Sequence, residues 1–372
     1  MHSKMKAFFC LVAAAVCCIL LRGYGHTDEV AAAGSELTAV YQNNDFQLTG
    51  VSVSKSGRLF VNFPRWSDRY LNAVVEVMPD GSTKPYPDEK WNRWDLKPTT
   101  AARQFVCVQS VVVDDADMLW VIDPASPLLA ANVIGGEKLV KIDLKTDSVT
   151  QVIPFDSDVA PPGSYLNDVR VDVTRNTAYI TDSGLGGIVV VDLSTGKAHR
   201  TLDGDRSVKA DTSIKIVIDG KPVLRNGKTP EFNSDGIALS PDGTYLYYQP
   251  LAGAILYRIR TELLRDPSAV KDKVAAGVEQ VAKTFPVDGL WMDKQWNIYL
   301  SGLSQKAVLR LDKQGHIETV AKDDRLEWPD TFSQGPDGAI YISASHINET
   351  PPYNEGKSVR REPFGLFKFQ PR

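Results

Sequence analysis

One structural pattern recurs six times along this chain and limits its fold more than any other feature of the sequence. Each copy has a polar residue at the start of a short strand, then a tight turn and a second strand, as in residues 234–247. A third strand of alternating character follows every copy, and a fourth follows five of them. Propeller blades with loop insertions have this spacing. The pattern predicts an all-β fold, a six-bladed β-propeller with four strands per blade. The alternative is a two-sheet sandwich, but that fold would not need six copies of one strand-turn-strand pattern.

The sixth copy lacks a fourth strand, while the start of the chain has a strand to spare. The third strand of that copy ends at Phe369, close to Arg372. Residues 37–41 have a strand pattern but no blade of their own. We expect this N-terminal strand to occupy the outer position of blade six, because it would close the ring and cover an open sheet edge.

The first residues have the pattern of a secretory signal peptide. Two lysines precede an apolar run over residues 7–21, which at about 15 residues is too short to span a bilayer. Small residues at 23–25 form a cleavage site, and 31–33 offer a second one. We expect a signal peptide at 1–25 and a single propeller domain at 26–372. The protein would then be secreted or periplasmic, with no stable membrane insertion after cleavage; the alternative is an uncleaved N-terminal anchor.

Charge and cysteine content bear on partners and on what holds the domain together. The formal net charge is -4, from 42 Lys and Arg against 46 Asp and Glu. We expect no nucleic-acid partner, because nucleic-acid binding needs a basic face. Of 4 cysteines, Cys107 alone lies outside the predicted signal peptide, which leaves no intrachain disulfide. Its apolar strand favours a buried, inert thiol over a nucleophile.

The polar residue at the start of each copy is the main functional signal. In a propeller the innermost strand of every blade begins at one mouth of the central channel, so these side chains should converge there. The six residues are Thr49, Gln109, Asn167, Asp235, Asp288 and Asp330. The loops after the second strands open at the same mouth and carry Phe63, Arg65, Trp66, Asp182 and His346. Two independent sets of side chains therefore predict one site.

Three carboxyl groups near one axis cannot all stay ionised without a cation or hydrogen-bond donors. A divalent cation, most readily Ca²⁺, accepts carboxylate and amide oxygens, and Asn167 and Asp235 are the candidate ligands. The ammonium group of a small-molecule ligand would serve too. The alternative is turn capping, in which such side chains bond to backbone amides. For catalysis, the candidate general bases are Asp235, Asp288 and His346.

Three segments resemble motifs of the Yellow / major royal jelly protein family. They are residues 57–66 (GRLFVNFPRW), 165–172 (YLNDVRVD) and 233–243 (NSDGIALSPDG), and the resemblance extends over nearly all of the predicted mature chain. It implies a secreted six-bladed propeller, in a family whose members are linked to dopachrome conversion, to biogenic-amine binding, or to no known reaction. Insect members usually carry disulfides, so a chain that cannot form one resembles a bacterial-type member.

A more distant resemblance is to the gluconolactonase / senescence-marker propellers. There, a Glu, an Asn and an Asp from blade starts hold a divalent cation, and another Asn lies beside the substrate. Asn167 and Asp235 fall on the Asn and Asp of the cation site, and Gln109 falls on the substrate Asn. Thr49 falls on the Glu, so the resemblance implies a site with one charged ligand fewer.

Two functional hypotheses follow. The first is a secreted propeller that binds a small polar or cationic aromatic molecule at the channel mouth. Its candidate ligand-binding residues are Thr49, Phe63, Arg65, Gln109, Asp182 and Asp330. The alternative is an enzyme at the same mouth, either a dopachrome-type tautomerase or a divalent-metal-dependent lactonase, with no further cofactor.

Overall fold

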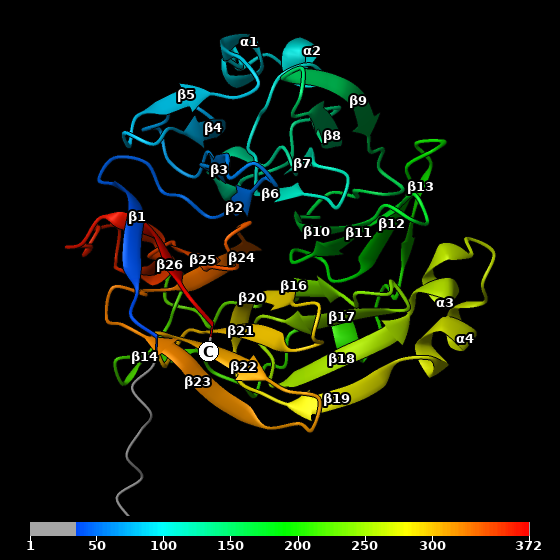
Figure 1. Cartoon of the computed structure of the whole chain (residues 1–372). Coiled ribbons are helices and arrows are strands. Elements are labelled where there is room, and N and C mark those ends of the chain that lie inside the picture. The colour runs from blue at the N-terminus through cyan, green and yellow to red at the C-terminus, as the bar shows by residue number, and fades with distance from the viewer. Residues whose placement is uncertain (1–34, 372) are drawn as a thin grey trace, which may run out of the picture. The chain divides into compact units, whose positions relative to one another are not determined.

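A computed structural model describes residues 35–371, and within this range six four-stranded antiparallel sheets surround a common axis (Figure 1). Each sheet is one blade, with its strands in chain order from the axis outward in the first five blades. The predicted six-bladed, all-β propeller is confirmed. The predicted signal peptide at 1–25 and its cleavage sites lie outside the described residues.

The first three blades follow one another directly along the chain. Blade one contains β2 (Val51–Val53), β3 (Leu59–Asn62), β4 (Val74–Val77) and β5 (Thr83–Pro85). Blade two contains β6 (Ser110–Val113), β7 (Met118–Asp123), β8 (Lys138–Asp143) and β9 (Ser148–Pro154). Blade three contains β10 (Leu166–Asp172), β11 (Thr177–Asp182), β12 (Ile188–Asp192) and β13 (Ala198–Thr201).

The remaining blades use the second half of the chain and its first strand. Blade four contains β16 (Ser234–Leu239), β17 (Tyr245–Pro250), β18 (Ile255–Arg260) and β19 (Glu279–Lys283). Blade five contains β20 (Val287–Met292), β21 (Ile298–Gly302), β22 (Ala307–Leu311) and β23 (Ile317–Lys322). Blade six contains β24 (Pro329–Gln334), β25 (Ile340–Ala344), β26 (Phe364–Phe369) and β1 (Thr38–Asn43).

The N-terminal strand closes the ring as predicted. β1 pairs antiparallel with β26, with Thr38 opposite Lys368 and Asn43 opposite Phe364. The strand begins and ends slightly later than the sequence pattern indicated. Leu37, just before it, is buried against blades five and six. Both ends of the propeller chain therefore stabilise one blade, which leaves no unpaired edge on β26.

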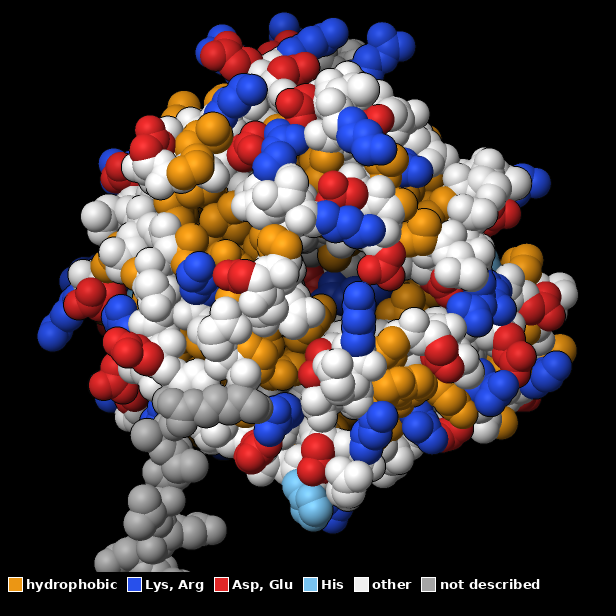
Figure 2. Space-filling model, in the orientation of Figure 1, with side chains coloured by type: hydrophobic (Ala, Val, Ile, Leu, Met, Phe, Trp, Pro, Cys, Tyr) orange, Lys and Arg blue, Asp and Glu red, His pale blue; other side chains and the backbone are white. Residues whose placement is uncertain are grey.

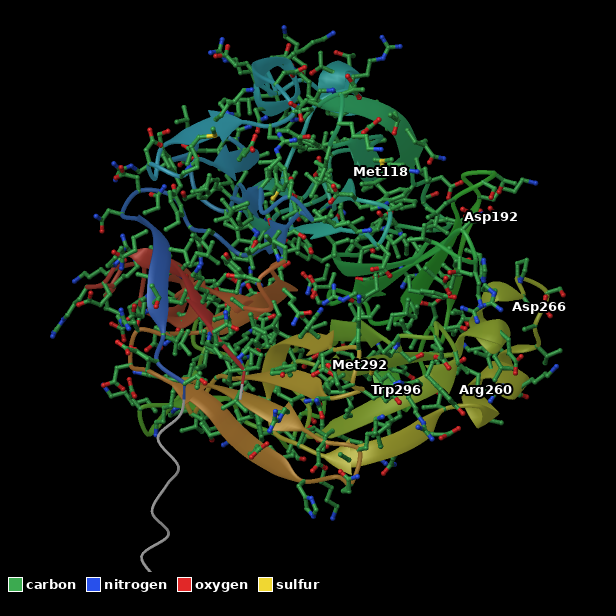
Figure 3. All side chains as sticks on the ribbon, viewed as in Figure 1. Met118, Asp192, Arg260, Asp266, Met292 and Trp296 are labelled. Carbon is green, nitrogen blue, oxygen red and sulfur yellow. The ribbon has the colours of Figure 1, made fainter. Side chains whose placement is uncertain are left out.

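Packing between neighbouring blades explains the apolar inner strands. Every residue of β11 is buried, and so is nearly every residue of β7, because a blade covers each face of these strands. The outermost strand β9 instead alternates exposed residues with half-buried or buried ones. The labelled side chains of Asp192, Arg260 and Asp266 illustrate this outer margin (Figure 3).

Short helices and one hairpin lie in the connections. The α-helices are α1 (Glu89–Asn92), α2 (Pro98–Ala101), α3 (Thr261–Arg265) and α4 (Lys271–Ala276). The 3₁₀ turns are η1 (Pro127–Leu129), η2 (Arg206–Val208), η3 (Ile347–Glu349) and η4 (Pro351–Tyr353). The hairpin of β14 (Val217–Ile218) and β15 (Lys221–Pro222) lies between blades three and four. Among residues 35–371, no helix has the length and apolar character needed to cross a membrane.

Cys107 is fully buried, and it is the one cysteine among the described residues. Burial is the largest cause of its raised thiol pKa, and the nearby charge of Asp123 raises it further. The thiol is therefore protonated at neutral pH. These surroundings agree with the inert thiol that the apolar sequence indicated.

Candidate functional site at the channel mouth

A cavity of about 1360 Å³ lies where the innermost strands begin. Side chains from all six blades line it, and the hollow at the centre of this face carries charged groups of both signs (Figure 2). Its volume is ample for a small molecule. The mouth predicted from the start of the repeats is therefore an open cavity, and the chemistry of its lining decides what it can hold.

Four of the six residues predicted at the axis line this cavity. They are Gln109, Asn167, Asp235 and Asp288, each at or just before the start of an innermost strand. Because these residues precede or begin β6, β10, β16 and β20, their side chains meet at the bottom of the mouth. We call this region the floor of the cavity.

A row of hydrogen bonds crosses the floor from blade three to blade six. The Asn167 amide donates to the Asp235 carboxyl group, which is in hydrogen-bonding contact with that of Asp288. The indole of Trp328 donates to the Asp288 carboxyl group at 2.5 Å. Asp235 and Asp288 therefore form one acid pair, fixed at both ends by neutral donors.

Burial favours the protonated form of this acid pair. It raises the pKa of Asp288 to about 6, although the hydrogen bonds with Asp235 and Trp328 lower this pKa. Burial also raises the pKa of Asp235 well above its ordinary value, and the charges of Asp288 and Asp168 raise it further. Two carboxyl groups in contact with little water cannot both ionise cheaply. Ionising both carboxyl groups of the pair is therefore unfavourable unless a cation lies beside them.

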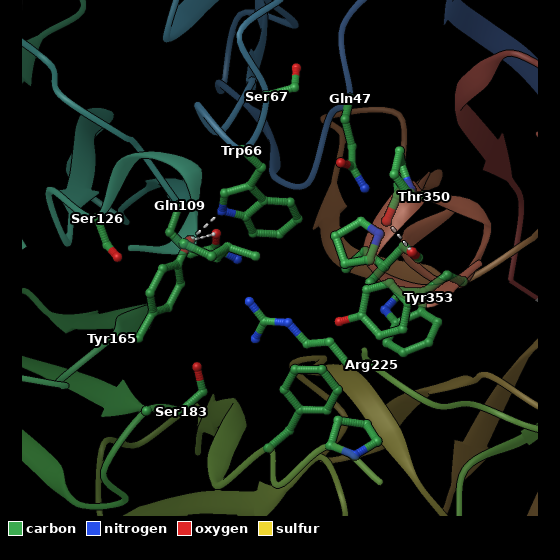
Figure 4. A pocket seen from close by; sticks show the side chains of 18 of the residues that line it. Gln47, Trp66, Ser67, Gln109, Ser126, Tyr165, Ser183, Arg225, Thr350 and Tyr353 are labelled. Atoms are coloured by element: carbon green, nitrogen blue, oxygen red, sulfur yellow. Dashed lines mark hydrogen bonds between the residues drawn. The ribbon is translucent and has the colours of Figure 1, made fainter. Parts of the chain in front are cut away.

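A second hydrogen-bond network occupies the opposite side of the floor. The indole of Trp66 donates to the Tyr165 hydroxyl at 2.8 Å, and that hydroxyl donates to the Gln109 side-chain oxygen at 2.8 Å (Figure 4). These residues come from blades one, three and two, so the network fixes three blades relative to one another. It also orients two aromatic faces beside the cavity.

Aromatic side chains make the walls. Trp66 and Tyr165 line one side, and Phe232, Trp328 and Tyr353 line another. The ring centroid of Trp328 lies 6.4 Å from that of Phe232 and 6.4 Å from that of Tyr353. An acidic floor within aromatic walls is chemically complementary to a positive charge attached to an aromatic ring.

A buried arginine crosses the channel deeper than the floor. Arg170 extends from β10 in blade three and donates to the Leu290 carbonyl in blade five at 2.7 Å. It donates at the same distance to the Val169 carbonyl, and the nearby Asp168 carboxyl has a pKa raised by burial. Because blades three and five are not neighbours, the side chain bridges the channel. The site is thus a cup that a ligand enters from the mouth.

Thr49, Phe63 and Arg65 do not line the cavity. The Thr49 hydroxyl donates to the Gln109 carbonyl at 3.0 Å and so joins blades one and two. Phe63 belongs to a hydrophobic cluster of blade one. The Arg65 guanidinium lies over the Tyr70 ring, 4.5 Å from its centroid. All three side chains point toward neighbouring blades or loops and contribute to the packing there.

Asp182, Asp330 and His346 are likewise buried outside the lining. Asp182 accepts hydrogen bonds from the backbone amides of Tyr165 and Gly184 and from the Arg200 side chain at 2.8 Å, so it anchors the loops before β10 and after β11. Asp330 accepts from the hydroxyl of Thr331 at 3.2 Å, and burial raises its pKa well above the ordinary value. His346 bonds to Glu349 at 2.7 Å, and its other ring nitrogen is buried without a partner.

Several lining residues were not predicted from the sequence. Gln47, Tyr165 and Trp328 each lie two positions before a predicted axis residue, and side chains two apart in an extended segment share a face. That spacing identifies Tyr165, whose partner Asn167 also lines the cavity, but not Gln47 and Trp328, because Thr49 and Asp330 do not line it and Trp328 has a left-handed backbone. Arg225 and Tyr353 lie in the connections before blade four and within blade six, where the repeat gives no positional information.

The described side chains do not complete the cation site that the gluconolactonase resemblance implies. Asn167 and Asp235 do stand together, but the amide nitrogen faces the carboxyl group. Thr49, at the position of the missing Glu, bonds to the backbone instead. Within residues 35–371, no group of three or more His, Cys, Asp or Glu side chains could hold a metal ion.

The fold and the cup at its mouth define a class, the six-bladed propellers with a site at one end of the channel. The model of the major royal jelly protein family matches residues 106–346, so the chain belongs to that family. It is 27% identical over 248 residues to major royal jelly protein 1 of Apis mellifera, covering 61% of this chain and 53% of that protein. It is 24% identical over 236 residues to protein yellow of Drosophila melanogaster, covering 58% and 41%.

The chain spans about half the length of the curated relatives it matches. Among solved structures, a gluconolactonase of Xanthomonas campestris superposes with a TM-score of 0.55 at 13% identity, over 91% of this chain and 90% of that one. At this identity the likeness shows the fold alone. The family and the propeller architecture are therefore established, while ligand and reaction rest on the site itself.

Proposed function

We propose that this protein binds a small cationic aromatic molecule in the cavity at the channel mouth. The observation that carries the proposal is the acid pair, Asp235 and Asp288, on a floor enclosed by aromatic walls. An ammonium group at the pair would replace the shared proton and remove the cost of burying two carboxyl groups. The aromatic body of the ligand would pack against Trp66 and Tyr165.

The test is calorimetric binding of two molecules of nearly equal shape, 2-phenylethylamine and 2-phenylethanol. The wild-type protein should bind the amine about tenfold or more tightly than the alcohol, because only the amine brings a charge to the acid pair. Asp235→Asn should abolish this preference. Asp330→Asn is the matched control, since Asp330 of blade six is as deeply buried as Asp235 but does not line the cavity. Equal binding of amine and alcohol by the wild type would refute the proposal.

An enzyme at the same mouth is the second candidate, favoured by one observation. The pKa of Asp288, raised to about 6 by burial, suits a general base that works near neutral pH. A dopachrome-type tautomerisation moves a proton between two positions of the substrate and needs no oxidant, so Asp288 would take up the proton and return it. Catalysed loss of dopachrome colour by the wild type, absent in Asp288→Asn, would support this candidate. Identical rates with and without protein would exclude it.

Ca²⁺ held at the floor by Asp235 and Asp288 is a narrower proposal, and it requires the Asn167 amide to turn its oxygen, in place of its nitrogen, toward the ion. Metal analysis of the dialysed protein and thermal unfolding with added Ca²⁺ test it. Loss of any Ca²⁺-dependent rise in Tm in Asp235→Asn would support it. A Tm that does not respond to Ca²⁺ in the wild type would remove both this proposal and the metal-dependent lactonase.

Secretion or a periplasmic location is proposed from the sequence pattern at 1–25. N-terminal sequencing of protein recovered from the medium or periplasm tests it. A new N-terminus near residue 26 is the expected result, and an intact Met1 on membrane-bound protein would favour the uncleaved anchor. We also propose a small-molecule ligand as the partner, with no nucleic acid.

A further inference from the structure

One arginine reaches into the cavity from its rim. Arg225 follows the hairpin β14–β15, and two backbone hydrogen bonds with Lys228, at 2.8 and 3.0 Å, hold its turn. The next amide donates to the Pro352 carbonyl at 2.7 Å, which ties this turn to blade six. The guanidinium projects into the open space between Tyr165 and Tyr353 (Figure 4). Backbone anchors on both sides thus direct a half-buried cation into the cavity.

The other arginines of the lining have partners of their own. Arg69 pairs with Asp45 at 2.5 Å. Arg360 donates to the Asn44 carbonyl at 2.6 Å and lies over the ring of Phe364. In the described part of the chain, no ion pair engages Arg225. Of the arginines that line the cavity, Arg225 is therefore the one whose charge is available to a ligand.

The positive rim and the acidic floor face each other across Tyr353. The pKa of the Tyr353 hydroxyl is raised to about 12 by burial, and it responds to both charges, because Arg225 lowers it and Asp288 raises it. Arg225 comes from a connection between blades, whereas Asp288 belongs to an innermost strand. The two opposite charges therefore lie at different depths of one cavity, with aromatic side chains between them.

We propose that the natural ligand is an amphoteric aromatic molecule, with a cationic group at the floor and a carboxylate or similar anion at Arg225. The inference rests on the proposed function and names its ligand class more narrowly. A guanidinium binds a carboxylate through two parallel hydrogen bonds, which favours this anion over an uncharged acceptor. The different depths of the charges place the two groups at opposite ends of the ring.

The test compares three probes of similar size. They are 2-phenylethylamine, 4-(2-aminoethyl)benzoate, which adds a carboxylate across the ring, and phenylalanine, whose two charges are adjacent. In the wild type, the aminoethylbenzoate should bind about tenfold more tightly than the plain amine. Phenylalanine should show little of this gain, because its carboxylate cannot reach the rim while its ammonium lies at the floor.

Variants assign the gain to Arg225. In Arg225→Gln the two amines should bind within about twofold of each other, while the plain amine binds at least as well as in the wild type. Arg225→Lys should restore part of the gain. Lys228→Gln is the matched control, because Lys228 lines the same rim but is exposed to solvent. Thermal unfolding of each variant identifies any loss of folded protein.

The outcomes separate this inference from the proposed function. If the wild type binds the plain amine and the aminoethylbenzoate equally, the inference is overturned and the proposed function stands. If Arg225→Gln weakens both amines alike, the guanidinium acts by stacking on the ring, which also overturns it. If neither amine binds the wild type, the proposed function fails and takes the inference with it.

Discussion

At the scale of residues, the floor of the cavity is organised around one acid pair. Asp235 and Asp288 are in hydrogen-bonding contact, and each accepts a hydrogen bond from a neutral donor, Asp235 from Asn167 and Asp288 from Trp328. The donors fix geometry without supplying charge. Burial of the pair favours its protonated form, so the stability of the protein should depend on pH even without a ligand.

The first prediction concerns the pH dependence of stability. Burial raises the pKa of Asp288 from about 3.8 in the unfolded chain to about 6 in the folded protein. Between these values the folded state holds more protons, so the free energy of unfolding falls as pH rises from about 4 through 6. Asp288 alone should contribute a fall on the order of 2 kcal/mol. Urea unfolding of wild type and Asp288→Asn across this range measures the difference, and parallel curves would contradict the prediction.

The second prediction concerns Asp235→Asn in the absence of ligand. The amide keeps the shape of the carboxyl group but removes a group that resists ionisation beside Asp288. The variant should therefore be more stable than the wild type at pH 7.5, by about 1–2 kcal/mol. At pH 4, where the wild-type pair is protonated, the gain should disappear. Differential scanning calorimetry at both pH values tests this, and a lower Tm for the variant at pH 7.5 would contradict it.

At the scale of elements, loop anchors and strand pairing hold the mouth in place. Asp123 ends β7, accepts three backbone hydrogen bonds and pairs with the buried Lys138 at 2.8 Å. Asp182 ends β11, accepts hydrogen bonds from the backbone amides of Tyr165 and Gly184, and pairs with Arg200 at 2.8 Å. These acids at strand ends are structural, so the loops they anchor are fixed before any ligand arrives.

The third prediction tests such an anchor. Lys138→Met removes the cation and leaves Asp123 fully buried with backbone donors alone. Breaking a buried pair in this way should cost about 3 kcal/mol. Urea denaturation measures the loss. Lys145→Met, at an exposed position of the following turn, is the control and should change stability little. Equal midpoints for both variants would show that the pair contributes nothing.

The fourth prediction tests the closure of the ring. A chain that begins at Asn44 lacks β1 and Leu37, whereas a chain that begins at Ser35 keeps them. Removing β1 should lower Tm by about 5–10 °C and expose the edge of β26, which promotes self-association. Calorimetry and light scattering measure both effects. A monomer with an unchanged Tm would show that blade six is stable with three strands.

At the scale of the whole molecule, the repeat made the architecture predictable, and the same repeat limited what could be said of the site. Six copies indicated six blades, and the unmatched strand at 37–41 indicated the closure. The pattern also led to the floor residues Asp235 and Asp288. It could not distinguish them from Thr49 and Asp330, because a small difference in backbone course decides whether a side chain meets the cavity or the next blade.

The parts of the site outside the repeat were beyond this reasoning. Arg225 and Tyr353 enter the cavity from long connections, whose path depends on contacts such as that between residue 226 and Pro352. Arg170 closes the channel through a hydrogen bond to Leu290, a contact between blades three and five. Such contacts form between segments that are far apart in the sequence, so no local sequence pattern predicts them.

The central claim is that a ligand cation replaces a proton on the acid pair. Calorimetry of 2-phenylethylamine binding at pH 6.5, in two buffers of different ionisation enthalpy, counts the protons released. The wild type should release protons on binding, because burial raises the pKa values of Asp235 and Asp288 and an ammonium group at the pair favours their ionised forms. Asp330→Asn should release nearly as much, and Asp235→Asn far less. Binding by the wild type without proton release would contradict the account.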